Sequence, residues 1–136
     1  MRLLHHVCSY ELSKRLEEVG YPQEGSLFYW NEHDSEAGGS QFVLEDAPLH
    51  LGKEEERAME TFAAPLASEL GEKLPRMVNG FYFRVERPQD GSWTIDYYEP
   101  DNAGDESRFG PFYADTLTEC LAKMLIHLAE NGLITL

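Results

Sequence analysis

The residues best suited to chemistry are a histidine among carboxylates and a cysteine near a second histidine. His33 lies between Glu32 and Asp34, and Glu36 follows three residues later. Imidazole nitrogen and carboxylate oxygen atoms bind divalent metals. The spacing matches neither a closed zinc site nor a calcium loop. We therefore expect a solvated acidic loop here, with no metal.

Cys120 and His127 are the second candidate pair, and a nucleophilic cysteine needs an adjacent base and an orienting group. Cys120 lies beside the apolar stripe of an expected helix, so we expect a buried, unreactive thiol. His127 is expected to border the same apolar face. The chain has no GxSxG, P-loop, GxGxxG or HExxH motif, so we expect no catalytic residue and no cofactor. An enzyme of unrecognised type, using Cys120 with His127 or His33 with Asp34, is an alternative.

A binding function is better supported, by two segments in which the side chains alternate between two strand faces, residues 81–86 and 93–98. If the segments pair as antiparallel strands, an arginine on one lies opposite carboxylates of the other, framed by tyrosines. Arginine and tyrosine dominate the energetics of many interfaces. Cross-strand charge pairing on a solvated sheet is the alternative. A further apolar strand face lies near residue 30. The candidate binding residues are therefore Tyr82, Arg84, Asp96, Tyr98, Phe28 and Trp30.

These residues need helices and strands to position them. Ser9 is predicted to cap a first helix of about three turns, whose apolar stripe is Leu12, Leu16 and Val19. Gly20 ends it. Residues 27–30 and 41–45 are predicted to form a hairpin around a long acidic loop that begins at Asn31.

The second half of the chain has clearer patterns. A helix is predicted from about residue 64 to Pro75. Residues 81–86 and 93–98 alternate around the sequence PQDG, which predicts an antiparallel hairpin. Pro111 favours an edge strand for residues 108–114. Thr116 and Glu119 form a predicted capping box for a last helix, which stops at Asn131, and residues 133–136 can fold back onto the core.

The order of elements is helix-strand-strand-helix-strand-strand-(strand)-helix. Strands joined by hairpins with helices on one side are typical of the α+β class. We predict an antiparallel sheet of about four to five strands packed against helices, in a single domain over residues 1–136. The length is sufficient for a hydrophobic core without covalent cross-links.

The charge balance is strongly acidic: 25 acids and 11 Lys plus Arg give a net charge of −14. Such a surface repels phosphate, so direct binding to nucleic acid or to an anionic membrane is not expected. A basic protein partner, or mimicry of DNA by the acidic surface, stays open. Solubility alone is the simplest explanation.

The sequence says less about the cellular compartment and about ligands. No apolar run approaches the roughly 20 residues of a membrane span. Cys8 and Cys120 lie far apart in the sequence, in no metal-binding pattern, so we expect two reduced, buried thiols and a cytoplasmic location. Nothing in the sequence indicates a particular small-molecule ligand.

Several blocks occur in a fixed order: LSKRLEEVGYPQ with LFYW, LASELGEKLP, FYFRVERPQDGSWTIDYYE and YADTLTECLAKMLIHLAENGLI. This arrangement resembles a family of small uncharacterised proteins of bacterial phages, prophages and other mobile elements. The resemblance covers most of the chain outside residues 46–61 and implies no catalytic residue. We expect a non-catalytic, protein-binding accessory module that binds a partner or itself. An acidic DNA mimic that counters host defence is a second hypothesis.

Overall fold

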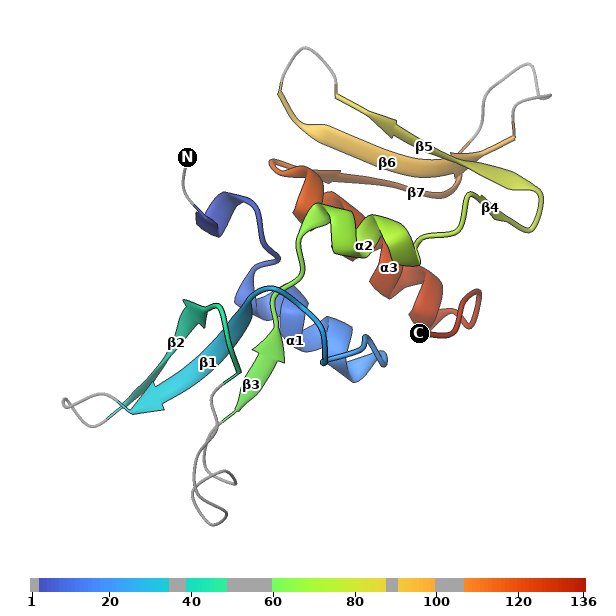
Figure 1. Ribbon diagram of the computed structural model, residues 1–136. Coiled ribbons are helices and arrows are strands. Elements are labelled where there is room, and N and C mark those ends of the chain that lie inside the picture. Colours follow the sequence, from blue (N-terminus) through green and yellow to red (C-terminus); the bar gives the residue numbers. More distant parts are fainter. Residues whose placement is uncertain (1–2, 35–38, 49–59, 88–90, 100–106) are drawn as a thin grey trace.

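The computed structural model describes residues 3–34, 39–48, 60–87, 91–99 and 107–136, which form a mixed set of helices and strands (Figure 1). The helices are η1 (Leu3–His5, a 3₁₀ turn), α1 (Tyr10–Glu18), α2 (Ala67–Lys73) and α3 (Leu117–Glu130). The strands are β1 (Tyr29–Asp34), β2 (Ser40–Glu45), β3 (Thr61–Ala63), β4 (Met77–Val78), β5 (Phe81–Glu86), β6 (Trp93–Tyr98) and β7 (Ser107–Ala114). The α+β class is confirmed.

The strands form two antiparallel sheets, ordered β2-β1-β3 and β4-β5-β6-β7. The predicted succession of elements is broadly matched, but β3 and β4 were not predicted. These strands have three and two residues, too few for an alternating pattern to be detected. They pair with β1 and β5 respectively, so their structure depends on residues distant in the sequence.

Helix α1 packs against both α3 and β3 and so joins the two sheets (Figure 1). Its N-terminus is capped as predicted, because Ser9 Oγ accepts a hydrogen bond from the N–H of Leu12 at 3.4 Å. The ring of Tyr10 stacks on Phe42 with 4.1 Å between centroids and lies 5.9 Å from Phe62. An aromatic cluster therefore attaches α1 to the smaller sheet.

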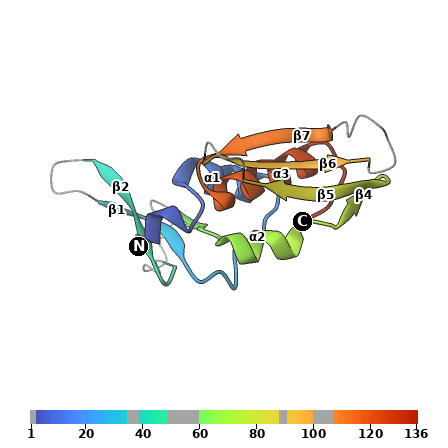
Figure 2. The same cartoon turned by 90° about the horizontal axis from the view of Figure 1, so that it is seen from above.

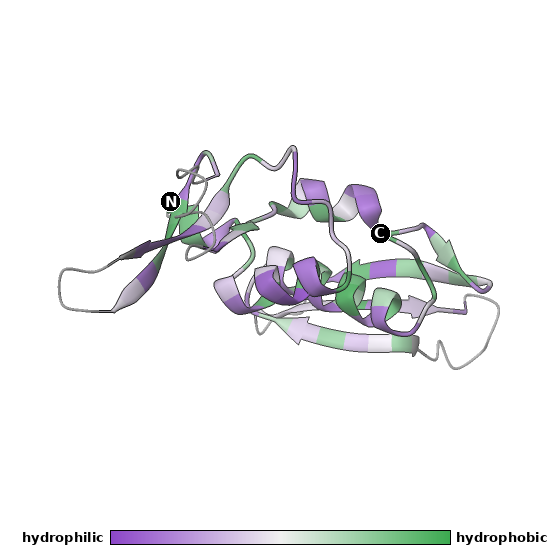
Figure 3. Cartoon of the chain, turned by 90° about the horizontal axis from the view of Figure 1, so that it is seen from below, coloured by the Kyte–Doolittle hydropathy of each residue, from purple (hydrophilic) through white to green (hydrophobic). Residues whose placement is uncertain are grey.

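Helix α3 covers one face of the four-stranded sheet, lying behind the strands in Figure 2 and in front of them in Figure 3. Its predicted apolar face is buried, and Ile95 and Tyr97 of β6 are fully buried in the same core. The Tyr97 hydroxyl donates to the carbonyl of Pro75 at 2.6 Å, which links β6 to the end of α2. As predicted, the C-terminal Leu133, Ile134 and Leu136 pack against this core.

Strand β7 lies at the sheet edge, as Pro111 predicted. Its pairing with β6 is irregular, because Ile95 faces Phe112 while Tyr97 faces Phe109. Gly110 lies at this irregularity with φ +93°, and a Cβ there would be 3.0 Å from the carbonyl oxygen of Ile95. The tight approach and the positive φ both require glycine.

Three sequence-based boundaries were wrong. The first strand begins at Tyr29, not at residue 27, and Leu27 is 59% exposed. The residues from Asn31 to Asp34, predicted as loop, extend this strand because β2 supplies partners for all of them. Helix α2 begins at Ala67, since Leu66 keeps an extended N-cap conformation.

Val85 shares a strand face with Phe81 and Phe83, which pack against the core, but it is 37% exposed near the end of β5. Glu36 and His50 lie outside the described residues. In the part of the chain that the structure describes, no helix has the length and apolar character needed to cross a membrane.

Candidate functional site

The predicted hairpin of β5 and β6 brings four of the six candidate binding residues together. Tyr82 pairs with Tyr98, and Arg84 pairs with Asp96, so the arginine lies opposite a carboxylate as the sequence predicted. Side chains alternate between the two faces of a strand, so all four lie on the face opposite α3. The same pairing adds further residues to this surface, which we call the outer face. Its members are Met77, Tyr82, Arg84, Glu86, Thr94, Asp96, Tyr98 and Tyr113.

A bidentate ion pair occupies the centre of the outer face. Arg84 donates from Nε to Asp96 Oδ1 at 2.9 Å and from Nη2 to Asp96 Oδ2 at 2.7 Å. The Arg84 guanidinium also lies 4.2 Å from the centre of the Tyr98 ring, and its Nε is 3.8 Å from Glu86. The Asp96 side chain is only 5% exposed. The two parallel hydrogen bonds and the ring contact hold this cluster in one geometry.

Exposed apolar and aromatic side chains surround the ion pair. Met77 is 48% exposed, Tyr82 44% and Tyr113 59%. A pocket of about 400 Å³ lies beside Met77 and Tyr82, and Arg76 and Phe83 complete its lining. Sequence reasoning missed Met77, because β4 has only two residues. It also missed Tyr113, whose face becomes clear only from its pairing with Thr94.

The other two candidate binding residues belong to the smaller sheet. The indole N–H of Trp30 donates to the carbonyl of Cys8 at 2.8 Å. Phe28 precedes β1, and its carbonyl accepts a hydrogen bond from the N–H of Ala64 at 2.9 Å. Both are half-buried. The Trp30 bond attaches β1 to the N-terminal segment, and the Phe28 bond joins the residue before β1 to the residue after β3.

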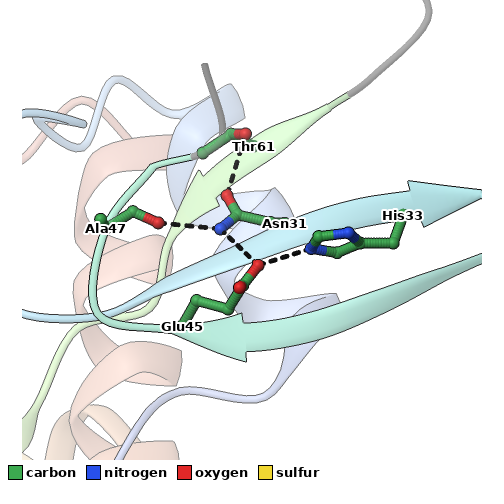
Figure 4. Close-up of polar contacts among 5 residues, drawn as sticks. All are labelled: Asn31, His33, Glu45, Ala47 and Thr61. Atoms are coloured by element: carbon green, nitrogen blue, oxygen red, sulfur yellow. Dashed lines mark hydrogen bonds and ion pairs between the residues drawn. The ribbon is translucent and has the colours of Figure 1, made fainter. Parts of the chain in front are cut away.

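A polar network joins the three strands of the smaller sheet (Figure 4). Asn31, only 1% exposed, donates to Glu45 Oε1 at 2.9 Å and to the carbonyl of Ala47 at 2.8 Å. Its own side-chain oxygen accepts from the Thr61 hydroxyl at 3.1 Å. His33 Nε2 lies 2.5 Å from the same Glu45 oxygen. Hydrogen bonds from His33 and then Asn31 lower the pKa of Glu45.

Carboxylates near His33 in the sequence made it a candidate metal ligand, although a loop without metal was the expectation. Glu32 lies on the opposite face of β1, and its Oε2 accepts from the N–H of Glu60 at 3.0 Å. Among the described residues, no three side chains of the metal-binding types gather in one place. The carboxylate that His33 contacts is Glu45, twelve residues away on β2.

The cysteines are two free, fully buried thiols, as predicted. Cys120 Sγ lies 3.2 Å from the carbonyl oxygen of Phe112, and burial raises the pKa of Cys120 to about 11. The thiol is therefore protonated at neutral pH. His127 borders the apolar face, with its ring centroid 5.2 Å from that of Phe112.

Carboxylates from α1 and the smaller sheet converge on another part of the surface. Burial, followed by the nearby charges of Glu60 and Glu18, raises the pKa of Glu17. Because Glu60 also bonds to Glu32, three elements contribute negative charge to one region. We call Glu17, Glu18, Glu32 and Glu60 the acidic cluster.

Comparisons of the chain with protein-family models, with curated proteins and with solved structures find no match. The resemblance to mobile-element proteins therefore rests on the sequence blocks alone.

Proposed function

We propose that this chain is a non-catalytic accessory protein that binds a protein partner through the outer face. The carrying observation is the exposure of Tyr82, Tyr113 and Met77 around the fixed Arg84–Asp96 pair. Aromatic, methionine and arginine side chains are enriched in the cores of protein interfaces. A prearranged surface also loses less conformational entropy when it binds.

This role fits a protein that belongs to a mobile element and is located in the bacterial cytoplasm. The block resemblance supports the origin, and two free buried thiols are compatible with a reducing compartment. The net charge of −14 disfavours direct contact with nucleic acid or anionic lipid. Protein surfaces are thus the partners that the chain suits best.

The proposal is tested by cross-linking and affinity capture from a bacterial lysate, with the wild type compared with Tyr82→Ser/Tyr113→Ser. Cross-links are expected to map to β5–β7, and the captured proteins should be lost with the double variant. Leu27→Ser is a matched control, because Leu27 is as exposed as Tyr113 and lies outside this sheet. Partners that cross-link elsewhere and tolerate the double variant would refute the proposal.

A second candidate, mimicry of DNA, is favoured by one observation, the acidic cluster. Its carboxylates come from α1, β1 and the segment leading into β3. A mimic would compete with duplex DNA for a basic DNA-binding protein, and Glu17→Gln/Glu32→Gln would weaken that competition. Unchanged DNA binding in the presence of excess chain would remove this candidate. A double variant that competes as well as the wild type would show that the acidic cluster is not the surface that mimics DNA.

A further inference from the structure

Resting on the proposed function, we infer that the protein partner of the outer face is a second copy of this chain. The two copies would form a symmetric dimer in which one outer face packs on the other. Such a contact is isologous, so each residue meets the same surface patch on the second copy. The inference is carried by the contrast between the local charge of this face and the charge of the whole chain.

Among the side chains that the structure describes, the outer face carries one positive and two negative charges, a net −1. They belong to Arg84, Glu86 and Asp96, and Arg84 contacts both carboxylates, Glu86 at 3.8 Å and Asp96 at 2.7 Å. The whole chain carries −14. Two copies that meet on this face keep most of their charge away from the contact. The Debye length of about 8 Å at physiological ionic strength then screens much of the remaining repulsion.

A basic partner would favour a different location. Opposite charges bring proteins together where their potentials are complementary. On this chain the acidic cluster gathers carboxylates of α1, of β1 and of the residue just before β3. The outer face offers a cationic partner little attraction. A second, equally acidic copy meets less repulsion there than at the acidic cluster.

The arrangement of exposed side chains also suits a two-fold contact. Tyr82 lies beside Tyr98 at one end of the paired strands, next to Met77 on β4. Tyr113 lies beside Thr94 at the diagonally opposite end. A two-fold axis in the interface, perpendicular to the line between these ends, places Tyr82 of one copy against Tyr113 of the other. The Arg84–Asp96 pair then lies near the axis.

Sedimentation equilibrium of the full chain, from about 5 to 200 μM in 50 and 500 mM NaCl, tests the inference. We expect a monomer–dimer equilibrium in which the higher salt lowers the dissociation constant, since screening weakens the repulsion between two acidic copies. Tyr82→Glu and Tyr113→Glu should each raise the dissociation constant at least tenfold. Leu27→Glu adds the same charge at an equally exposed site and should leave it unchanged.

Circular dichroism confirms which variants are folded, and two separate tyrosine variants protect the test if one misfolds. A chain that stays monomeric at every concentration and salt would overturn the inference. So would a dimer that Leu27→Glu disrupts and Tyr113→Glu does not. A monomeric chain whose Tyr82 region cross-links a different protein would overturn the second-copy inference alone and leave the proposed function intact.

Discussion

The carboxylate of Glu119, in the first turn of α3, accepts a 2.7 Å hydrogen bond from the backbone N–H of Ser9. Its other oxygen lies 3.3 Å from the Ser9 hydroxyl. Ser9 caps α1, and the two residues are 110 positions apart in the sequence. The bond therefore places one negative charge between the N-termini of two helices, where the partial charges of the helix dipoles are positive.

Removing the Glu119 carboxylate should loosen the junction of α1 and α3. We expect Glu119→Ala to lower the free energy of unfolding by about 1–3 kcal/mol, because the N–H of Ser9 loses its charged acceptor. Urea unfolding followed by tryptophan fluorescence measures the change. Glu130→Ala is the control, since the exposed Arg15–Glu130 pair should contribute at most about 1 kcal/mol. Equal effects of the two variants would contradict a stabilising role for the hydrogen bond between Glu119 and Ser9.

Arg84→Met should destabilise the fold by about 2–3 kcal/mol, because it removes two charge-assisted hydrogen bonds to the buried Asp96. Chemical denaturation is again the measurement. Arg15→Met removes an arginine from an exposed ion pair and should change stability by less than about 1 kcal/mol. If Arg84→Met were as stable as Arg15→Met, the central pair would not hold the outer face together.

Glu45 should make stability depend on pH. Its pKa is lowered in the folded state by hydrogen bonds from His33 and Asn31. The stabilisation is therefore fully present above the unfolded pKa, about 4.3, and is lost as pH falls through the folded value. Glu45→Gln should be less stable than wild type at pH 7, and the difference should shrink below about pH 4. If the difference in stability stays constant from pH 7 to pH 3, the folded state does not lower the pKa of Glu45.

Two glycine substitutions should have opposite signs. Gly110→Ala should destabilise by more than about 1 kcal/mol, because φ is +93° and the new Cβ would be 3.0 Å from two backbone atoms. Gly71 lies inside α2 with nothing within 4 Å of its Cβ position, so Gly71→Ala should stabilise by about 0.5–1 kcal/mol. Thermal unfolding of both variants checks the pair. A stabilising Gly110→Ala would mean that β7 adjusts freely around this residue.

The hairpin at the centre of the candidate site was predictable from the sequence. Alternation fixes which side chains share a face, and the sequence PQDG between the two segments indicates that they pair as a hairpin. These two local signals put an arginine opposite carboxylates, and the structure pairs Arg84 with Asp96. The same holds for α1 and α3, where the helical spacing of leucines and the caps at Ser9 and Thr116 lie within short stretches of chain.

The tertiary structure decided whatever depends on partners far apart in the chain. The sequence assigned Glu119 to a capping box with Thr116. The N–H of Glu119 does donate to that hydroxyl, but its carboxylate bonds to Ser9. Asn31 was assigned to a loop, yet Glu45, Ala47 and Thr61 give its buried amide partners. A local pattern records the conformational preference of its own residues, whereas a buried polar group takes whichever partner the packed elements bring within reach.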